Sequence, residues 1–284
     1  MKNCIITGGN SGIGFAAAMQ IAAKGHGVTL ICRNEASAQN ACAEIILNTG
    51  NENVDYLIAD LSEMKAVRRA AAKYLDAGAS LDVLINNAAD FDLSVRRPIM
   101  TSDGMEKQFA TNVAAPFLLA RLLFPALERS KGKIINISSQ GLCVYPFIKL
   151  DFDNLNGERS YTPSKTYYQN KLALLMWSLY MADEQEDVKI QAVRVTNVKS
   201  DMSRYAHIHP LLKQMYRVKS KFSISPEEMA KVYTALATTD GYSGFLYDEK
   251  MREVRANRSA YDKPAQKRLY ELLCQKTAMN HYSD

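Results

Sequence analysis

The chain has 284 residues, of which 47% are hydrophobic and 23% charged, a composition that excludes disordered and fibrous classes. Its 35 basic and 30 acidic residues leave a formal charge of only +5, which argues against a nucleic-acid partner. No apolar run reaches the roughly 20 residues of a membrane span, because Arg121 and Pro125 interrupt the longest one. Five cysteines without metal-ligand spacing indicate buried thiols in a reducing compartment. We therefore expect a cytoplasmic protein with no metal, no leader peptide and no membrane or nucleic-acid partner.

Short apolar runs alternate along the chain with longer segments of helical periodicity. This alternation predicts an α/β fold of the Rossmann type, with a doubly wound parallel sheet of about seven strands and helices on both faces. Without repeats or flexible linkers, residues 1–284 are expected to form a single domain. The expected strands are 4–6, 28–32, 54–59, 81–86, 133–138, 188–195 and 244–247. The expected helices are 12–24, 35–48, 62–77, stretches up to 128, a long helix ending near 183, and 225–237.

Two segments interrupt this rhythm, an insertion at about 141–160 and a segment rich in Lys, Arg, Tyr and Met at about 199–224. Both follow predicted strands, and loops at the carboxyl ends of such strands surround the ligand crevice. We expect the first to border the site and the second to form a lid. Plain surface decoration is the alternative for both. A tail helix is expected at about 259–276.

A glycine-rich turn joins the first strand to the first helix. Glycines let the backbone approach a pyrophosphate, and the helix amino end offers free N–H groups to its charge. The spacing is G-x-x-x-G-x-G, and a tight turn without a ligand is the alternative interpretation. The residues expected to hold the dinucleotide here are Gly8, Asn10, Ser11, Gly12, Ile13 and Gly14.

The end of the second strand normally distinguishes NAD from NADP. It carries no acid here, but Arg33 followed by Asn34, and a guanidinium suits a 2′-phosphate. We therefore predict NADP(H) as the cofactor, with NAD(H) less favoured. A solvent-facing Arg33 is the alternative. Asp60 and Leu61, after the third strand, are placed to contact the adenine edge.

Four further motifs follow in order: Asn86-Asn87-Ala88-Ala89 after the fourth strand, Asn112 within a helix, Ser138-Ser139 ending the fifth strand, and Tyr167–Lys171 opening a helix. With the glycine turn they resemble the short-chain dehydrogenase/reductase family over residues 3 to about 200. The long gap between Ser139 and Tyr167, the Cys32-Arg33 strand end and the tail helix resemble its retinol dehydrogenase and protochlorophyllide reductase branch. That branch uses NADP(H) on bulky apolar substrates.

The resemblance implies hydride transfer between nicotinamide and a small-molecule substrate that carries a carbonyl or alcohol group. Tyr167 would be the general acid/base, and Lys171, one helical turn away, would favour its phenolate. Ser139 would bind the substrate oxygen, and Asn112 would anchor a water that links Lys171 to solvent. Two alternatives stay open. Tyr161 and Lys165 repeat the Y-x-x-x-K spacing, although Pro163 favours a helix start after Tyr161. Ser138 could replace Ser139.

The same resemblance implies further cofactor contacts from Asn87, Ala88, Tyr167, Lys171, Asn197 and Val198. The sequence departs from the family where Asn170 precedes the lysine and where Asn197 stands in place of a usual glycine. Ser200 or Asp201 occupies the region of a usual threonine that binds the nicotinamide amide.

Several aromatic, Met and Cys side chains could line an apolar substrate pocket or simply pack in the core. They are Phe91, Cys143, Tyr145, Phe147, Met202, Tyr205, Met215 and Tyr216. His207 and His209 lack a third ligand for a metal. A non-catalytic NADP-binding or redox-sensing protein is the competing function, and C=C reduction or epimerisation would use the same Tyr and Lys. A homodimer through helices 100–128 and 164–183 is compatible with the family, unless the carboxyl tail blocks that surface.

Overall fold

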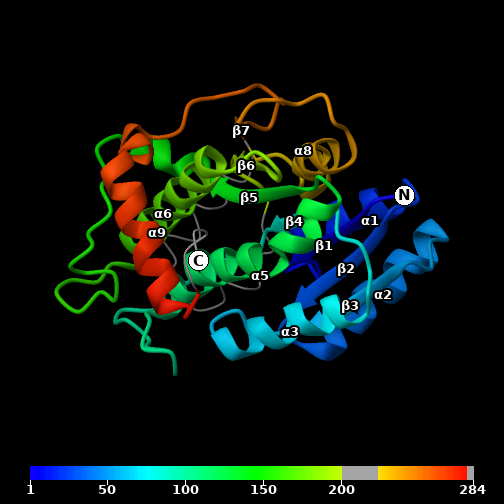
Figure 1. The fold of residues 1–284 in the computed structure, drawn as a ribbon, viewed down its shortest axis with the longest axis horizontal. Helices are drawn as coiled ribbons and strands as arrows, with labels where there is room; N and C mark the ends of the chain where they lie inside the picture. Colours follow the sequence, from blue (N-terminus) through cyan, green and yellow to red (C-terminus); the bar gives the residue numbers. More distant parts are fainter. Residues whose placement is uncertain (200–222, 280–284) are drawn as a thin grey trace.

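The computed structural model describes residues 1–199 and 223–279, which form a seven-stranded sheet in the order β3-β2-β1-β4-β5-β6-β7 (Figure 1). All six pairings between neighbouring strands are parallel. The direction of winding reverses between β1 and β4, which creates the switch point where such sheets bind ligands. The strands are β1 Asn3–Thr7, β2 Gly27–Cys32, β3 Val54–Ile58, β4 Val83–Asn86, β5 Lys133–Ser139, β6 Lys189–Val195 and β7 Leu246–Tyr247.

The helices follow the strands as the alternating sequence pattern predicted, so the predicted fold class is confirmed. The last strand is shorter than expected, two residues in place of 244–247, because Gln191 of β6 bonds the carbonyls of Tyr242 and Gly244 through its side chain instead. The helical segments are α1 Gly12–Ala22, α2 Glu35–Thr49, α3 Met64–Asp76, α4 Lys107–Phe109, the π-helical turn η1 Ala110–Ala114, α5 Ala115–Arg129, the 3₁₀ turn η2 Gln140–Val144, α6 Pro163–Glu184, α8 Pro226–Thr238, the 3₁₀ turn η4 Arg258–Tyr261 and α9 Lys263–Lys276.

Both faces of the sheet are buried, each under its own layer of helices. Ile5 of β1 belongs to a core shared with α3, α5, α6 and α9, whereas its neighbours Cys4 and Ile6 belong to a second core with α1, α2 and α8. Successive side chains of a strand point to opposite faces, so a strand covered on both sides must be apolar throughout. This requirement explains the uninterrupted apolar runs in the sequence.

One helical stretch corrects the expectation that no segment is long enough to cross a membrane. The helical stretch Lys107–Arg129 comprises α4, η1 and α5. It is long and apolar enough to cross a membrane, but 78% of its most apolar 18-residue segment is buried inside the protein. Pro125 lies within α5 without ending it, and the Arg121 guanidinium donates to the hydroxyl of Tyr270 at 2.5 Å. The stretch packs here as the central helix of one core.

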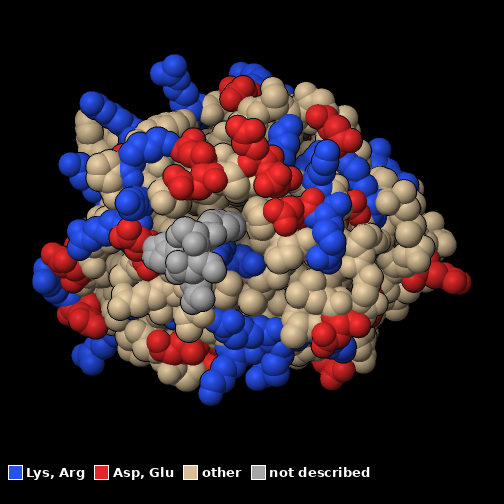
Figure 2. Space-filling view, viewed as in Figure 1, with Lys and Arg blue, Asp and Glu red and all other residues tan. Residues whose placement is uncertain are grey.

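The carboxyl-terminal helix α9 packs along α6 (Figure 1). The Tyr270 ring lies 5.4 Å from that of Phe117 in α5 and 4.7 Å from that of Tyr180 in α6. The tail therefore covers part of the α5–α6 face that the expected homodimer would use, which favours the alternative that the tail blocks it. Over the described part of the surface shown in Figure 2, basic and acidic side chains are interspersed.

Candidate active site

A cavity of about 900 Å³ lies at the carboxyl ends of β1 to β4, over the switch point of the sheet. Its walls come from the glycine turn before α1, the end of β2, and the segments that follow β3 and β4. Most residues expected to hold the cofactor line it. They are Gly8, Asn10, Ser11, Gly12, Ile13, Arg33, Asn34, Asp60, Leu61, Asn87, Ala88, Tyr167 and Val198.

Two glycines shape the turn in different ways. Gly12 has φ +59°, and a Cβ built on it would meet nothing within 4 Å, so its backbone faces open space in the cavity wall. Gly14 does not line the cavity. A Cβ there would lie 2.4 Å from Nδ2 of Asn87 and 2.6 Å from the carbonyl oxygen of Gly8. The first glycine therefore leaves room for a pyrophosphate at the amino end of α1, and the second allows the helix to approach β4.

Asn87 fastens the end of β4 to the end of β1. Its Nδ2 donates to the carbonyl of Thr7 at 2.9 Å, and the backbone N–H groups of Asn87 and Ala88 both donate to the Thr7 hydroxyl at 3.0 Å. These bonds hold the two segments at the switch point in a fixed relation. The Nδ2 group of Asn87 is thus engaged by the protein, and the residue also lines the cavity.

The opposite end of the cavity carries the basic group expected to bind a phosphate. Arg33 is exposed, and within the described residues its guanidinium makes no hydrogen bond or ion pair. Oδ1 of Asn34 accepts from the N–H of Ser37 at 2.9 Å and caps α2. Oδ1 of Asp60 accepts from the N–H and hydroxyl of Ser62 at 2.9 and 2.7 Å. Arg33 therefore presents at this end a charged donor group that is not engaged by the described residues.

Tyr167 and Lys171 lie on one face of α6, one turn apart. The Lys171 side chain is 2% exposed, and its Nζ lies 5.6 Å from the centre of the Tyr167 ring and donates to the carbonyl of Ile137 at 2.7 Å. Burial lowers the pKa of Lys171 from 10.5 to about 8. Tyr167 lines the cavity and Lys171 lies behind it, so the tyrosine reaches a ligand first.

Aromatic rings hold Tyr167 on two sides. The Phe91 ring, from the segment after β4, lies 4.4 Å from the Tyr167 ring between centroids, and the Tyr168 ring packs edge-on at 5.3 Å. Phe91 also lines the cavity, as expected for a wall residue. These contacts restrict the ring of Tyr167 while leaving the residue at the cavity wall.

The alternative pair, Tyr161 and Lys165, is not brought together in this way. Tyr161 precedes α6, which begins at Pro163, and its hydroxyl accepts from Nε2 of Gln108 at 3.0 Å. Burial and the nearby Glu106 raise the pKa of Tyr161 to about 12. Lys165 is exposed on α6. The geometry favours Tyr167 with Lys171 as the acid/base pair.

Ser138 and Ser139 end β5 with their side chains on opposite faces. The Ser139 hydroxyl accepts from the N–H of Gly141 at 3.1 Å and caps the turn η2. Ser138 is 2% exposed, and its hydroxyl has no hydrogen-bond partner among the described residues. Both line a second, smaller cavity and not the large one.

Asn112 is fully buried in the π-helical turn η1. Its Nδ2 donates to the carbonyl of Asp90 at 2.8 Å, and its Oδ1 accepts from the N–H of Asp90 at 2.7 Å. The side chain therefore holds the loop after β4, next to Phe91, against the helix. A water linked to Lys171, as the family resemblance implies, would have to use other atoms of this turn.

Several expected residues lie elsewhere. The carbonyl of Asn197 accepts from the N–H of Ile224 at 3.1 Å, and Asn197 does not line the cavity. The Tyr145 ring packs on that of Tyr168 at 4.9 Å, and Phe147 is 90% exposed, so neither forms part of the large cavity's wall. Outside the described residues lie most of the expected lid and its candidates Ser200, Asp201, Met202, Tyr205, His207, His209, Met215 and Tyr216.

The large cavity also has wall residues that the sequence reasoning missed: Ile31, Cys32, Ser37, Ala59, Ala89, Asp90, Lys107, Thr111, Lys199 and Pro226. Lys107 and Thr111 are four positions apart, so they lie on the same face of a helix, and Thr111 is next to the motif residue Asn112. This spacing could have identified both as wall residues. Lys107 pairs with Asp90 at 3.5 Å. In the parts of the chain that are described, no three His, Cys, Asp or Glu side chains are grouped to hold a metal.

Comparisons with known proteins agree with this geometry. The sequence model of the short chain dehydrogenase family matches residues 2–209. Human retinol dehydrogenase 14 is 31% identical over 291 residues, covering 95% of this chain and 84% of that protein. The bovine dehydrogenase/reductase SDR family member 12 is 41% identical over 169 residues, which cover 59% of this chain and 51%, about half, of that protein. The crystal structure of a metagenomic short-chain oxidoreductase in complex with NADP is 26% identical with a TM-score of 0.59, covering 87% of this chain and 95% of the other.

Proposed function

Because this chain belongs to the short-chain dehydrogenase family, in its retinol dehydrogenase-like branch, we propose that it is an NADP(H)-dependent oxidoreductase of alcohol and carbonyl groups. The observation that carries the proposal is the position of Tyr167 at the wall of a dinucleotide-sized cavity with the buried cation of Lys171 directly behind it. A fold with this cavity but without such a pair would support cofactor binding alone.

The residues present fit an NADP molecule. The open backbone at Gly12 and the amino end of α1 suit the pyrophosphate, and the uncommitted guanidinium of Arg33 suits a 2′-phosphate. Asp60 and Leu61 would border the adenine, and Val198 would border the nicotinamide end. When bound, the nicotinamide donates or accepts the hydride. The NADP complex of the metagenomic relative supports the choice of NADP, and Arg33 supports it independently.

The protein's own groups would handle the proton. The hydroxyl of Tyr167 would donate a proton to the carbonyl oxygen during reduction and remove it from the alcohol during oxidation. Lys171 would stabilise the phenolate by its charge, since its Nζ is 5.6 Å from the ring and buried from water. The hydroxyl of Ser139 would bind the substrate oxygen, after exchanging its present bond with the N–H of Gly141.

The substrate side of the proposal is an apolar alcohol or aldehyde. Phe91 contributes an aromatic wall beside Tyr167, and a relative that matches 95% of the chain is a retinol dehydrogenase. A cytoplasmic location remains a prediction, and the position of α9 over α5 and α6 favours the alternative to the homodimer.

The experiment is a spectrophotometric assay of NADPH oxidation with aliphatic, aromatic and isoprenoid aldehydes, retinal among them. We expect turnover of at least one aldehyde, and Tyr167→Phe should lower kcat by about 10²–10⁴-fold while NADPH still binds. Tyr168→Phe is the matched control, because its ring neighbours Tyr167 but does not line the cavity. NADPH binding without turnover of any compound would favour the non-catalytic alternative, and full activity in Tyr167→Phe would refute the assigned role.

A further inference from the structure

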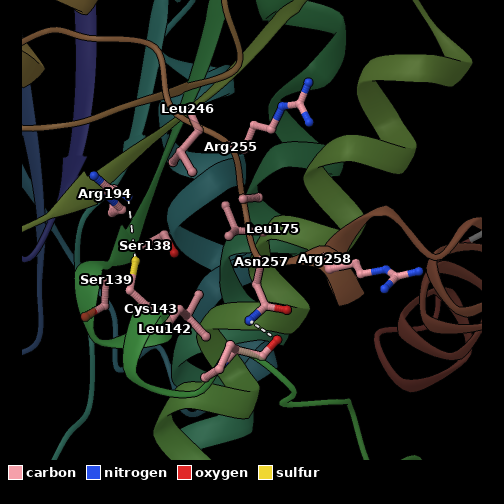
Figure 3. Close-up of a pocket in the computed structure, with 12 residues that line it drawn as sticks. Ser138, Ser139, Leu142, Cys143, Leu175, Arg194, Leu246, Arg255, Asn257 and Arg258 are labelled. Carbon is pink, nitrogen blue, oxygen red and sulfur yellow. Dashed lines mark hydrogen bonds between the residues drawn. The ribbon is translucent and has the colours of Figure 1, made fainter.

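A second cavity, of about 270 Å³, lies at the carboxyl ends of β5, β6 and β7, apart from the cofactor cavity (Figure 3). Ser138 of β5 and Arg194 of β6 are direct partners in the parallel register, so their side chains share one face of the sheet. Leu142, Leu175 and Leu246 form apolar walls around them. The cavity is therefore mostly apolar, with a polar group at one end.

Two buried hydrogen-bond donors line this cavity without an acceptor. Ser138 is 2% exposed, and neither its hydroxyl nor Nε of Arg194 has a partner among the residues that the structure describes. In Figure 3 the hydroxyl of Ser138 points toward the middle of the cavity. Buried polar groups in proteins are nearly always paired, so two unpaired donors in one cavity indicate a missing acceptor.

The charge balance calls for an anionic acceptor. Nη1 of Arg194 lies 3.6 Å from Sγ of Cys143, and Nη2 lies 3.9 Å from Oδ2 of Asp248. The same carboxylate binds Arg252 more closely, at 2.6 and 2.8 Å, so one acid serves two guanidinium groups. No acid lines the cavity, and the exposed Arg258 at its rim points away from the centre in Figure 3.

We propose that this cavity is a binding site for a small organic carboxylate. The carboxylate oxygens accept from Nε of Arg194 and from the hydroxyl of Ser138, and a short aliphatic chain packs against the three leucines. An arginine and a hydroxyl together suit a carboxylate, because an ionised acceptor makes stronger hydrogen bonds than a neutral one. Neither Arg194 nor Ser138 lines the cofactor cavity, whereas Ser139, the proposed ligand of the substrate oxygen, lines this same small cavity.

The site has a built-in reporter. All five cysteines are free, four are buried, and the exposed one, Cys143, lines this cavity beside Arg194. Iodoacetamide alkylates a thiol when the thiolate displaces iodide and forms a C–S bond. We expect saturating hexanoate to slow alkylation of Cys143 by about tenfold, and hexanamide, its neutral counterpart, to protect far less. The rate is followed by mass spectrometry of the peptide that contains Cys143.

Two variants separate the site from general effects of the acid. Arg194→Met should abolish protection by hexanoate, whereas Arg258→Met, which removes a rim arginine that points to solvent, should keep it. If Arg194→Met does not fold, the wild-type protein still decides. Its alkylation by the anionic reagent iodoacetate should be inhibited by hexanoate and not by hexanamide. Equal effects of hexanoate and hexanamide, or no effect of either, would overturn the proposal.

The alkylation readout needs no turnover, so its failure cannot be confused with failure of the proposed reaction. A kinetic experiment identifies the source of the carboxylate. Hexanoate that competes with an aldehyde substrate would show that the site holds part of the substrate, and non-competitive behaviour would show a separate ligand. Either pattern requires the site, whereas hexanoate that neither slows alkylation nor inhibits the reaction would overturn the proposal.

Discussion

Replacing Lys171 by methionine tests the environment of the proposed acid/base pair through protein stability. Lys171 is 2% exposed, and burial lowers its pKa from 10.5 to about 8. Between these values the unfolded chain keeps a proton that the folded protein has lost. The free energy of unfolding must therefore rise with pH across this window. From pH 7 to pH 10 the gain for this one lysine amounts to about 2–3 kcal/mol.

The assay is urea denaturation of wild type and Lys171→Met at both pH values, monitored by the fluorescence of the single tryptophan, Trp177, which is fully buried. The other titrating groups, including the buried Lys133, are present in both proteins and cancel in the difference. We expect the stability of wild type relative to the variant to increase by about 2–3 kcal/mol from pH 7 to pH 10. A difference that does not change with pH would show that Lys171 is solvated, and the argument for a buried cation behind Tyr167 would fail.

Four other substitutions test the cofactor cavity and its supports. Arg33→Ala should weaken NADPH binding about 10- to 100-fold and leave NADH binding unchanged in fluorescence titrations, because only NADPH offers a phosphate to the guanidinium. Gly14→Ala should lower the free energy of unfolding in urea by about 3 kcal/mol, because its Cβ would lie 2.4 Å from Nδ2 of Asn87. Gly12→Ala should lower it by only about 1–2 kcal/mol, because the space around Gly12 is open and the cost comes from its φ of +59°. Asn112→Ala should cost about 2–3 kcal/mol by thermal unfolding, since it leaves the N–H and carbonyl of Asp90 unpaired, and an unchanged melting temperature would contradict that role.

The sheet was predictable because its physical requirement is local. A strand covered on both faces must be apolar at every position, as Cys4, Ile5 and Ile6 show by dividing between two cores. The glycine turn was predictable for a similar reason, since Gly12 and Gly14 are needed where a side chain would strain the backbone or strike a neighbour. The helix boundaries and the short β7 depended on helix caps and side-chain hydrogen bonds, which the hydrophobic pattern of the sequence does not predict.

The candidate site was only partly predictable. Motif order located Tyr167, Lys171 and the residues around the switch point, but it could not show that the side chain of Asn112 is bonded to the backbone of Asp90. Phe91 packs on Tyr167 across 76 positions of sequence, a contact that follows from the strand order and not from any local pattern. The pairing of Tyr161 with Gln108 likewise became visible only when α4 and α6 were placed together.

The sequence by itself determined the doubly wound sheet, the dinucleotide turn and the spacing of Tyr167 and Lys171, because each depends on residues that are neighbours in the chain. Only the tertiary structure decided how deeply Lys171 is buried and therefore how far its pKa is lowered, because helices and strands distant in sequence pack around it together. It also decided that Ser138 and Arg194 meet in a cavity. Their strands are distant in sequence and adjacent in the sheet, and the register that aligns them is a property of the whole fold.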